Sequence, residues 1–178
     1  MPSDKPATNP EAQVAALFAN YEPALAKLGK ACRAKMRERL PGLNEIVYMY
    51  ENQKALVIAY SPSAGGGGSD ALCSIWLNPE CARLYFTKGV LLSKSVPKSL
   101  LQGSGGTVRY VALDSAADID RPEVEAVMAA ALKLANVRLD PKAKGALILK
   151  AEEQKQRALR TKKAARPAAA SRTTKTRR

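Results

Sequence analysis

Apolar residues in the first 40 positions recur at the three- and four-residue spacing of helices that bury one face. Asn9 can cap a first helix over residues 10–20, because Pro10 in the opening turn loses no needed backbone hydrogen bond. Pro23 interrupts this helix and can begin a second one. The apolar positions of the second helix are Leu25, Leu28, Cys32, Met36 and Leu40, and Pro41-Gly42 ends it.

Beyond Gly42 the pattern changes to short runs rich in valine, isoleucine and aromatic residues, separated by turn residues, which is typical of strands. Strands that follow one another through short connections pair as antiparallel neighbours. The five predicted strands are residues 45–50, 55–60, 72–77, 83–87 and 107–113. Helices before and after such a run indicate an α+β fold with a mainly antiparallel sheet.

The third and fourth strands present two different faces, since alternate residues point to opposite sides of a sheet. Asn78-Pro79 indicates a tight turn between them, and we expect Trp76 to lie opposite Cys81. One face then carries Cys73, Ile75, Leu77, Ala82, Leu84 and Phe86, which we expect to form the core side. The other is more polar and aromatic than a buried layer needs, and we expect it to be partly open; it carries Ser74, Trp76, Arg83, Tyr85 and Thr87.

The last third of the chain predicts one clear helix and one ambiguous segment. Asp120 and Glu123 have the spacing of a capping box, which places the start of the helix there. The apolar run 146–149 can form a short strand, which we favour, or begin a helix that reaches about Lys163. From Ala164 onward no apolar face could be buried, and disorder is expected.

Positive charge is concentrated at the end of the chain. Residues 1–141 hold 16 basic and 14 acidic side chains, whereas residues 142–178 hold 13 and 2. We therefore expect a flexible segment 1–8, a near-neutral domain over 9–150 and a basic tail over 151–178. Such a tail can bind nucleic-acid phosphates or simply keep the domain soluble. Its candidate contacts are Lys162, Lys163, Arg166, Arg172, Lys175, Arg177 and Arg178.

Composition excludes several catalytic classes. The chain has no histidine, which rules out Ser/His/Asp and Cys/His catalysis and zinc sites built on histidine. Three cysteines at spacings that match no zinc motif indicate reduced thiols. No apolar run reaches the roughly 20 residues of a membrane-spanning helix, and the first residues lack the pattern of a signal peptide. We expect a cytoplasmic protein without catalytic activity, cofactor, metal site or membrane segment.

Several segments, taken in order, resemble the YdhG-like family, known as domain of unknown function 1801. They are residues 44–48 leading to 55–62, residues 74–79, residues 100–105, and residues 108–111 continuing to 117–120. The resemblance implies an α-β(5)-α two-layer sandwich with a curved, mainly antiparallel sheet and helices packed on one face. Most members have no assigned activity, and some are described as frataxin-like iron chaperones.

The second predicted helix carries a basic face opposite its apolar one, formed by Lys27, Lys30, Arg33, Lys35, Arg37 and Arg39. A charged face of this kind is most often a solvated surface. It also disfavours the iron-chaperone role, which depends on acidic residues because iron ions prefer carboxylate oxygen.

The mixed face of the sheet is the place where we expect a ligand or partner to bind. Trp76, Arg83, Tyr85 and Arg109 combine surface for stacking with positive charge. The alternative is a face covered by loops of the same chain or by a second copy of it.

Two further groups of residues suggest weaker sites. Lys94, Lys98, Gly103 and Gly105 could hold an anion, because glycine lets backbone N–H groups approach it. This loop leads into a strand instead of a helix, which favours a simple turn. The carboxylates of Asp114, Asp118 and Asp120 could bind a cation, but capping and turn formation account for them better.

The sequence therefore favours a non-enzymatic module that binds a ligand or partner on its sheet. One alternative is a nucleic-acid-associated protein that acts through its basic tail. The other is a frataxin-like iron chaperone, which the basic second helix disfavours.

Overall fold

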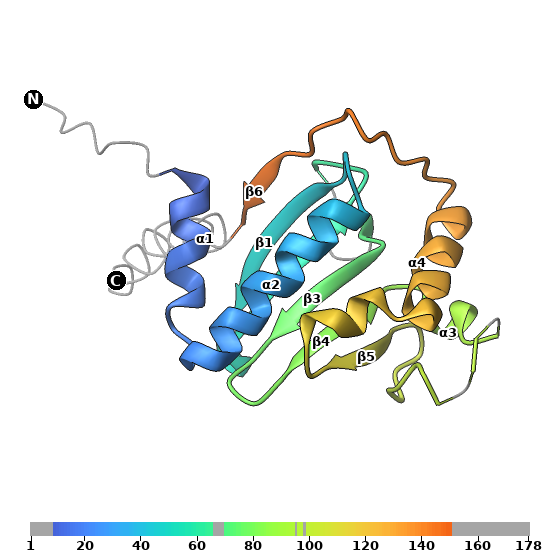
Figure 1. The fold of residues 1–178 in the computed structure, drawn as a ribbon, viewed down its shortest axis with the longest axis horizontal. Helices are drawn as coiled ribbons and strands as arrows, with labels where there is room; N and C mark the ends of the chain where they lie inside the picture. Colours follow the sequence, from blue (N-terminus) through green and yellow to red (C-terminus); the bar gives the residue numbers. More distant parts are fainter. Residues whose placement is uncertain (1–8, 66–69, 95, 98, 151–178) are drawn as a thin grey trace, which may run out of the picture.

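A computed structural model describes residues 9–65, 70–94, 96–97 and 99–150. Two helices come first and are followed by five strands with two short helices among them; a third short helix, a long helix and a sixth strand complete the described chain (Figure 1). The elements are α1 (Pro10–Phe18), α2 (Pro23–Arg39), β1 (Asn44–Tyr50), η1 (Glu51–Gln53), β2 (Ala55–Ser61), β3 (Cys73–Leu77), β4 (Ala82–Phe86), α3 (Gly89–Leu92), β5 (Arg109–Leu113), η3 (Ala116–Asp120), α4 (Pro122–Leu134) and β6 (Leu147–Leu149).

The six strands form one sheet in the order β5-β4-β3-β2-β1-β6. The first five pair as antiparallel neighbours, which confirms the α+β prediction, while β6 lies parallel to β1. The ambiguous run 146–149 is therefore a strand and not a helix. It completes one edge of the sheet, with Ile148 opposite Ile46.

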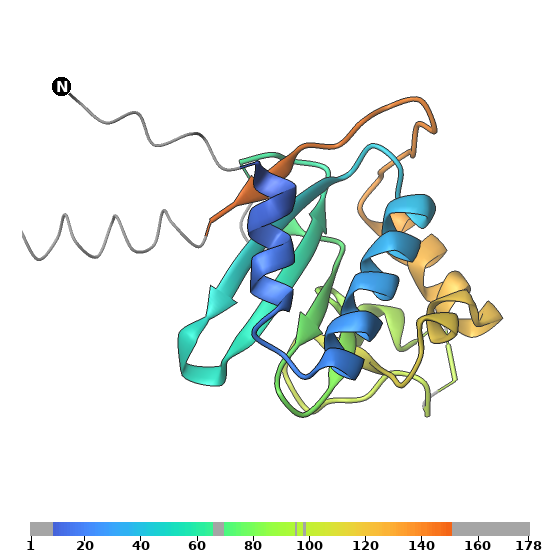
Figure 2. The ribbon, with the colours of Figure 1, turned by 60° about the vertical axis from the view of Figure 1, so that its left-hand side comes forward.

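The helices lie on one side of the sheet and enclose the core (Figures 1 and 2). Helix α2 runs across the sheet and buries Cys32 and Met36 completely. Gly29 lets it approach closely, because a Cβ atom there would lie 2.7 Å from the ring of Phe18 and 3.1 Å from Leu77. Helix α4 buries an apolar stripe formed by Val124, Val127, Met128 and Ala131.

The predicted pairing of β3 and β4 is wrong by two residues. Trp76 lies opposite Arg83, not Cys81, because the turn spans residues 78–81 and is closed by Asn78 N–H donating to the carbonyl of Cys81 at 3.1 Å. A shift of two residues equals the strand period, so each side chain stays on its predicted face.

The sequence suggested that Asp120 caps α4, but in the structure it does not. A capping box does form five residues earlier, where Ser115 and Asp118 begin η3. The carboxylate of Asp120 instead pairs with Lys35 and Arg39 of α2. Ion pairs between this carboxylate and two charged side chains are stronger than its hydrogen bonds to the backbone N–H groups of a helix end would be.

The basic face of α2 is only in part the solvated surface that was expected, because Lys27, Lys30 and Arg37 are exposed and the other three residues are not. Arg33 is only 9% exposed, and Lys35 and Arg39 are paired with acidic groups after β5. Arg39 contacts Glu125 as well. These pairs join α2 to η3 and α4.

The segments predicted to be flexible or disordered, 1–8 and 151–178, lie outside the described residues, and the nucleic-acid candidates of the tail lie there with them. Within the described residues, no helix combines the length and the apolar character needed to cross a membrane.

Candidate functional site

A row of aromatic rings crosses the face of the sheet opposite the described helices. Tyr50, Trp76, Tyr85 and Tyr110 follow one another with ring centroids 5.4, 5.7 and 5.2 Å apart. Tyr48 extends the row with an edge contact to Tyr50 at 5.4 Å. The rings come from β1, β3, β4 and β5, so the row spans most of the sheet. We call these five residues the aromatic row.

Strand register brings these rings together. Ser74 of β3 lies opposite Tyr85, and Tyr85 in turn lies opposite Tyr110. Trp76 is a diagonal neighbour of Tyr85, within reach of large side chains on the same face of a sheet. Ring pairs that are tilted or edge-on, as here, are favourable because the positive edge of one ring meets the negative face of the next.

One positive charge lies within the aromatic row. The guanidinium carbon of Arg83 sits 4.5 Å from the centre of the Tyr110 ring, and its Nη1 donates to the Tyr85 hydroxyl at 3.3 Å. This cation–π contact holds the arginine against the sheet while leaving it partly exposed. The face can therefore offer both stacking surface and charge.

The aromatic row is the open part of this face. Tyr50 is 46% exposed, and Tyr48, Trp76, Tyr85 and Tyr110 are partly exposed. Farther along the same strands the face is closed, because Ile46 and Ala59 are buried in a small cluster with Ala71. This face of the sheet is thus accessible to solvent at the aromatic row and not along its whole length.

Trp76, Arg83 and Tyr85 therefore lie together, but Arg109 does not join them. Arg109 alternates with Tyr110 along β5 and belongs to the opposite side, where its guanidinium donates to the carbonyls of Gly105 at 2.5 Å and Val108 at 2.7 Å. Sequence reasoning missed Tyr48, Tyr50 and Tyr110. The sequence shows that Tyr48 and Tyr50 share one face of their strand. Their proximity to the other rings, and that of Tyr110, depends on the order of the strands in the sheet.

The glycine segment suggested as an anion site pairs instead with the edge of the sheet. Gln102 forms a β-bridge with Tyr110, and Gly103 follows with φ +110, a conformation that suits glycine. Gly103 and Gly105 are exposed, as is Lys94, and Lys98 lies outside the described residues. Arg109 also donates to the carbonyl of Gly105, which holds the segment against the start of β5. The anion site stays a prediction.

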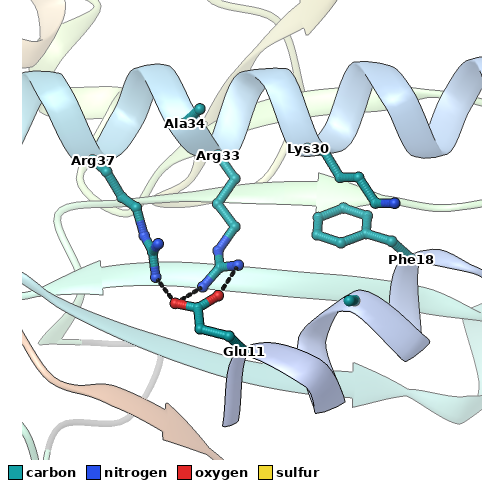
Figure 3. A pocket seen from close by; sticks show the side chains of 7 residues that line it. Glu11, Phe18, Lys30, Arg33, Ala34 and Arg37 are labelled. Atoms are coloured by element: carbon teal, nitrogen blue, oxygen red, sulfur yellow. Dashed lines mark hydrogen bonds and ion pairs between the residues drawn. The ribbon is translucent and has the colours of Figure 1, made fainter. Parts of the chain in front are cut away.

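A second feature is an ionic cluster between α1, α2 and β1, formed by Glu11, Arg33, Arg37 and Glu45. Glu45 is only 4% exposed and accepts hydrogen bonds from Arg33 at 2.7 Å and Arg37 at 2.6 Å, and from the Tyr60 hydroxyl at 3.3 Å. Glu11 of α1 accepts from the same two arginines on their outer side (Figure 3). Sequence reasoning did not find this cluster.

The ionic cluster borders an open pocket of about 530 Å³ between α1 and α2. Burial would raise the pKa of the Glu11 carboxyl, but hydrogen bonds from Arg37 and Arg33 outweigh it and lower that pKa from its usual value of 4.5. Glu11 is therefore ionised at neutral pH. Figure 3 shows its carboxylate facing both guanidinium groups, with Lys30 on the same wall.

The cysteines are poor nucleophiles where they are buried. Burial raises the pKa of Cys73 to about 12 and, with the nearby charge of Asp118, the pKa of Cys32 to about 11. All three thiols are free, and only Cys81 is partly exposed. The two buried thiols therefore lack the lowered pKa that marks a reactive cysteine.

We therefore expect iodoacetamide at about pH 8 to modify Cys81 in the folded protein and to reach Cys32 and Cys73 only after unfolding. Peptide mass spectrometry of the labelled chain measures this directly. Rapid modification of Cys73 without denaturant would contradict the buried position of that thiol.

Two of the three aspartates considered as a metal site have other partners for their carboxylates. Asp118 accepts from the backbone N–H groups of Asp114 and Ser115, and Asp120 pairs with α2. Among the described residues, no group of three cysteine or acidic side chains is placed to hold a metal ion.

Comparisons with protein-family models, with curated proteins and with solved structures each returned no match. The resemblance to the YdhG-like family therefore stays a prediction.

Proposed function

We propose that this protein is a non-enzymatic binding module that takes single-stranded nucleic acid on the open face of its sheet. The aromatic row carries the proposal. Bases of every kind have a flat apolar face, and aromatic side chains on an exposed antiparallel sheet are a recurring platform for stacking them.

The dimensions of the aromatic row support a ligand longer than one ring. Neighbouring strands lie about 4.8 Å apart, so a row that reaches from β1 to β5 extends over roughly 19 Å. A single nucleobase would cover only part of it. Successive unstacked bases of one strand match the row better than an isolated planar molecule does.

Charge supports the same partner. Arg83 lies within the aromatic row, and residues 151–178 hold ten lysine or arginine side chains against two glutamates. Lys150 donates its backbone N–H to the carbonyl of Val47 at 2.8 Å, so the last described residue before the basic tail lies close to Tyr48. The tail lacks aromatic residues, and the sheet supplies them. Together they offer stacking and phosphate neutralisation.

Trp76 is the chain's single tryptophan and provides the test. Titration with oligothymidylate should quench its fluorescence, and the affinity should fall steeply between about 50 and 200 mM salt. Tyr85→Leu and Tyr110→Leu, which keep apolar bulk but remove the ring, should each weaken binding roughly tenfold. Arg121→Gln, a charge change at the exposed start of α4, serves as the control and should leave affinity nearly unchanged.

A chain ending at residue 150 separates the contributions of sheet and tail. It should retain ring-dependent binding with a shallower salt dependence. Equal affinities for the wild type and both leucine variants, with all binding lost on removal of residues 151–178, would overturn the role of the sheet and leave the tail as the only contact.

Membership of the YdhG-like family and a cytoplasmic location belong to this proposal. Three free thiols suit a reducing compartment, where single-stranded RNA is abundant and disulfides are rare. No contact among the described residues favours the iron-chaperone alternative, because the acidic groups near α2 are engaged with arginine and lysine.

A further inference from the structure

We infer that the pocket between α1 and α2 is a binding site for a small organic anion, and that Glu11 occupies the position of the ligand's acid group. The site is separate from the aromatic row and lies on the helical side of the sheet (Figure 3). It does not depend on the proposed nucleic-acid function.

Two guanidinium groups already hold a carboxylate at this position. Arg33 donates from Nη1 to Oε2 of Glu11 at 2.8 Å and from Nη2 to Oε1 at 3.3 Å. Arg37 donates from Nη2 to Oε1 at 2.5 Å. A planar fork that meets both oxygens of one carboxylate is also the geometry with which arginine recognises carboxylate and phosphate groups of ligands.

The two arginines would stay in place if Glu11 moved away. Glu45 lies beneath them and bonds both, and its side chain is only 5% exposed. A site whose cations are fixed from behind is preorganised, because no arginine has to be reoriented when an anion arrives.

Glu11 itself can leave without disrupting its helix. Its side chain is 48% exposed and bonds only Arg33 and Arg37 among the described residues. Helix α1 is anchored instead by Val14 and Phe18, which are completely or almost completely buried. Rotation of the Glu11 side chain into solvent therefore frees the fork while α1 remains packed.

A third cation and an apolar wall of the pocket indicate the chemistry of the rest of the ligand. Lys30 lines the pocket one helical turn before Arg33, and its ammonium has no hydrogen bond or ion pair within the described part of the chain. Ala15, Phe18 and Ala34 supply apolar surface between these charges. The pocket volume of about 530 Å³ lies in the range of small-molecule sites.

The ligand class that fits is a short organic acid with two anionic groups joined by an apolar segment. One group replaces the Glu11 carboxylate on Arg33 and Arg37, and the other meets Lys30. Carboxylate and phosphate share the chemistry that this fork recognises, so two probes of similar length distinguish the source of the charge: glutarate, a dicarboxylate, and 4-phosphonobutyrate, in which a phosphonate replaces one of the two carboxylates.

Glu11→Gln provides the decisive variant, because it removes the competing charge and keeps the size of the side chain. In low-salt isothermal titration of the full chain, it should bind at least one probe about tenfold more tightly than the wild type. Glu38→Gln removes a charge from the exposed side of α2 outside the pocket and should bind like the wild type. Addition of Lys30→Gln to Glu11→Gln should reverse most of the gain.

Lys30 has no structural partner within the described residues, so its replacement tests binding without testing folding. Thermal unfolding of each variant verifies that the fold is intact. The assignment would be overturned if neither probe showed saturable binding. It would also be overturned if Glu11→Gln and Glu38→Gln bound the probes with equal affinity. Either result would leave the aromatic row and its nucleic-acid test unaffected.

Discussion

Replacement of Glu45 by alanine is expected to lower the free energy of unfolding by about 3 to 5 kcal/mol. Glu45 is the shared acceptor for Arg33, Arg37 and the Tyr60 hydroxyl, and it is 4% exposed. Its removal leaves the Arg33 guanidinium buried with only Glu11 to neutralise it. An uncompensated buried charge costs far more than an exposed one, because water cannot replace the lost partner.

Urea denaturation of the wild type and of Glu45→Ala measures this loss. Glu123→Ala is the matched control, since Glu123 pairs with Arg121 at 3.8 Å and both side chains are about half exposed. A pair of that kind contributes about 1 kcal/mol or less. Similar losses for the two variants would contradict a stabilising role for the buried ionic cluster.

Gly89→Ala is the second substitution with a large expected effect, a loss of about 3 kcal/mol. Gly89 is buried at the start of α3, against β5. A Cβ atom there would lie 2.9 Å from the Cα atom of Arg109 and still closer to its backbone nitrogen. Backbone atoms in a sheet cannot move aside as the end of a long side chain can, so α3 must shift away from β5.

The control for this clash is Gly106→Ala, because a Cβ atom at Gly106 meets nothing within 4 Å. It should leave stability within about 0.5 kcal/mol of the wild type. Chemical denaturation compares the two, and amide exchange of Val90, whose N–H donates to Thr107 at 2.9 Å, reports on α3 locally. An unchanged midpoint for Gly89→Ala would show that α3 can be repositioned at little cost.

The periodic parts of the fold could be predicted from sequence because each pattern records which side of an element is buried. The helices from Pro10 and Pro23 and the first five strands lie within two residues of their expected limits. The four-residue helix α3 was not predicted, since one turn is too short for a repeat to show. Capping of α4 was predicted wrongly because Asp120 has ionic partners that lie on α2, 81 and 85 residues away.

The candidate sites show the same difference between residues that a local pattern places and residues that only tertiary packing brings together. Trp76, Arg83 and Tyr85 could be placed on one face because they belong to adjacent strands of a hairpin. Tyr50 and Tyr110 join them only through the order of the strands. The ionic cluster depends on Glu11 meeting Arg33, 22 residues along the chain, through the packing of α1 on α2. No local pattern records such a contact, and charged residues on a helix otherwise indicate solvent.

Strand β6 has a consequence for the order in which the chain can fold. It pairs with β1, which lies far from it in the sequence: Ala146 donates its backbone N–H to the side chain of Asn44, 102 residues earlier. During synthesis the edge of β1 stays unpaired until the residues of β6 emerge from the ribosome, while the β1–β2 and β3–β4 hairpins can close early. An unpaired strand edge invites association with other chains. Nascent chains that stall before residue 147 should therefore be more prone to aggregation than the finished protein.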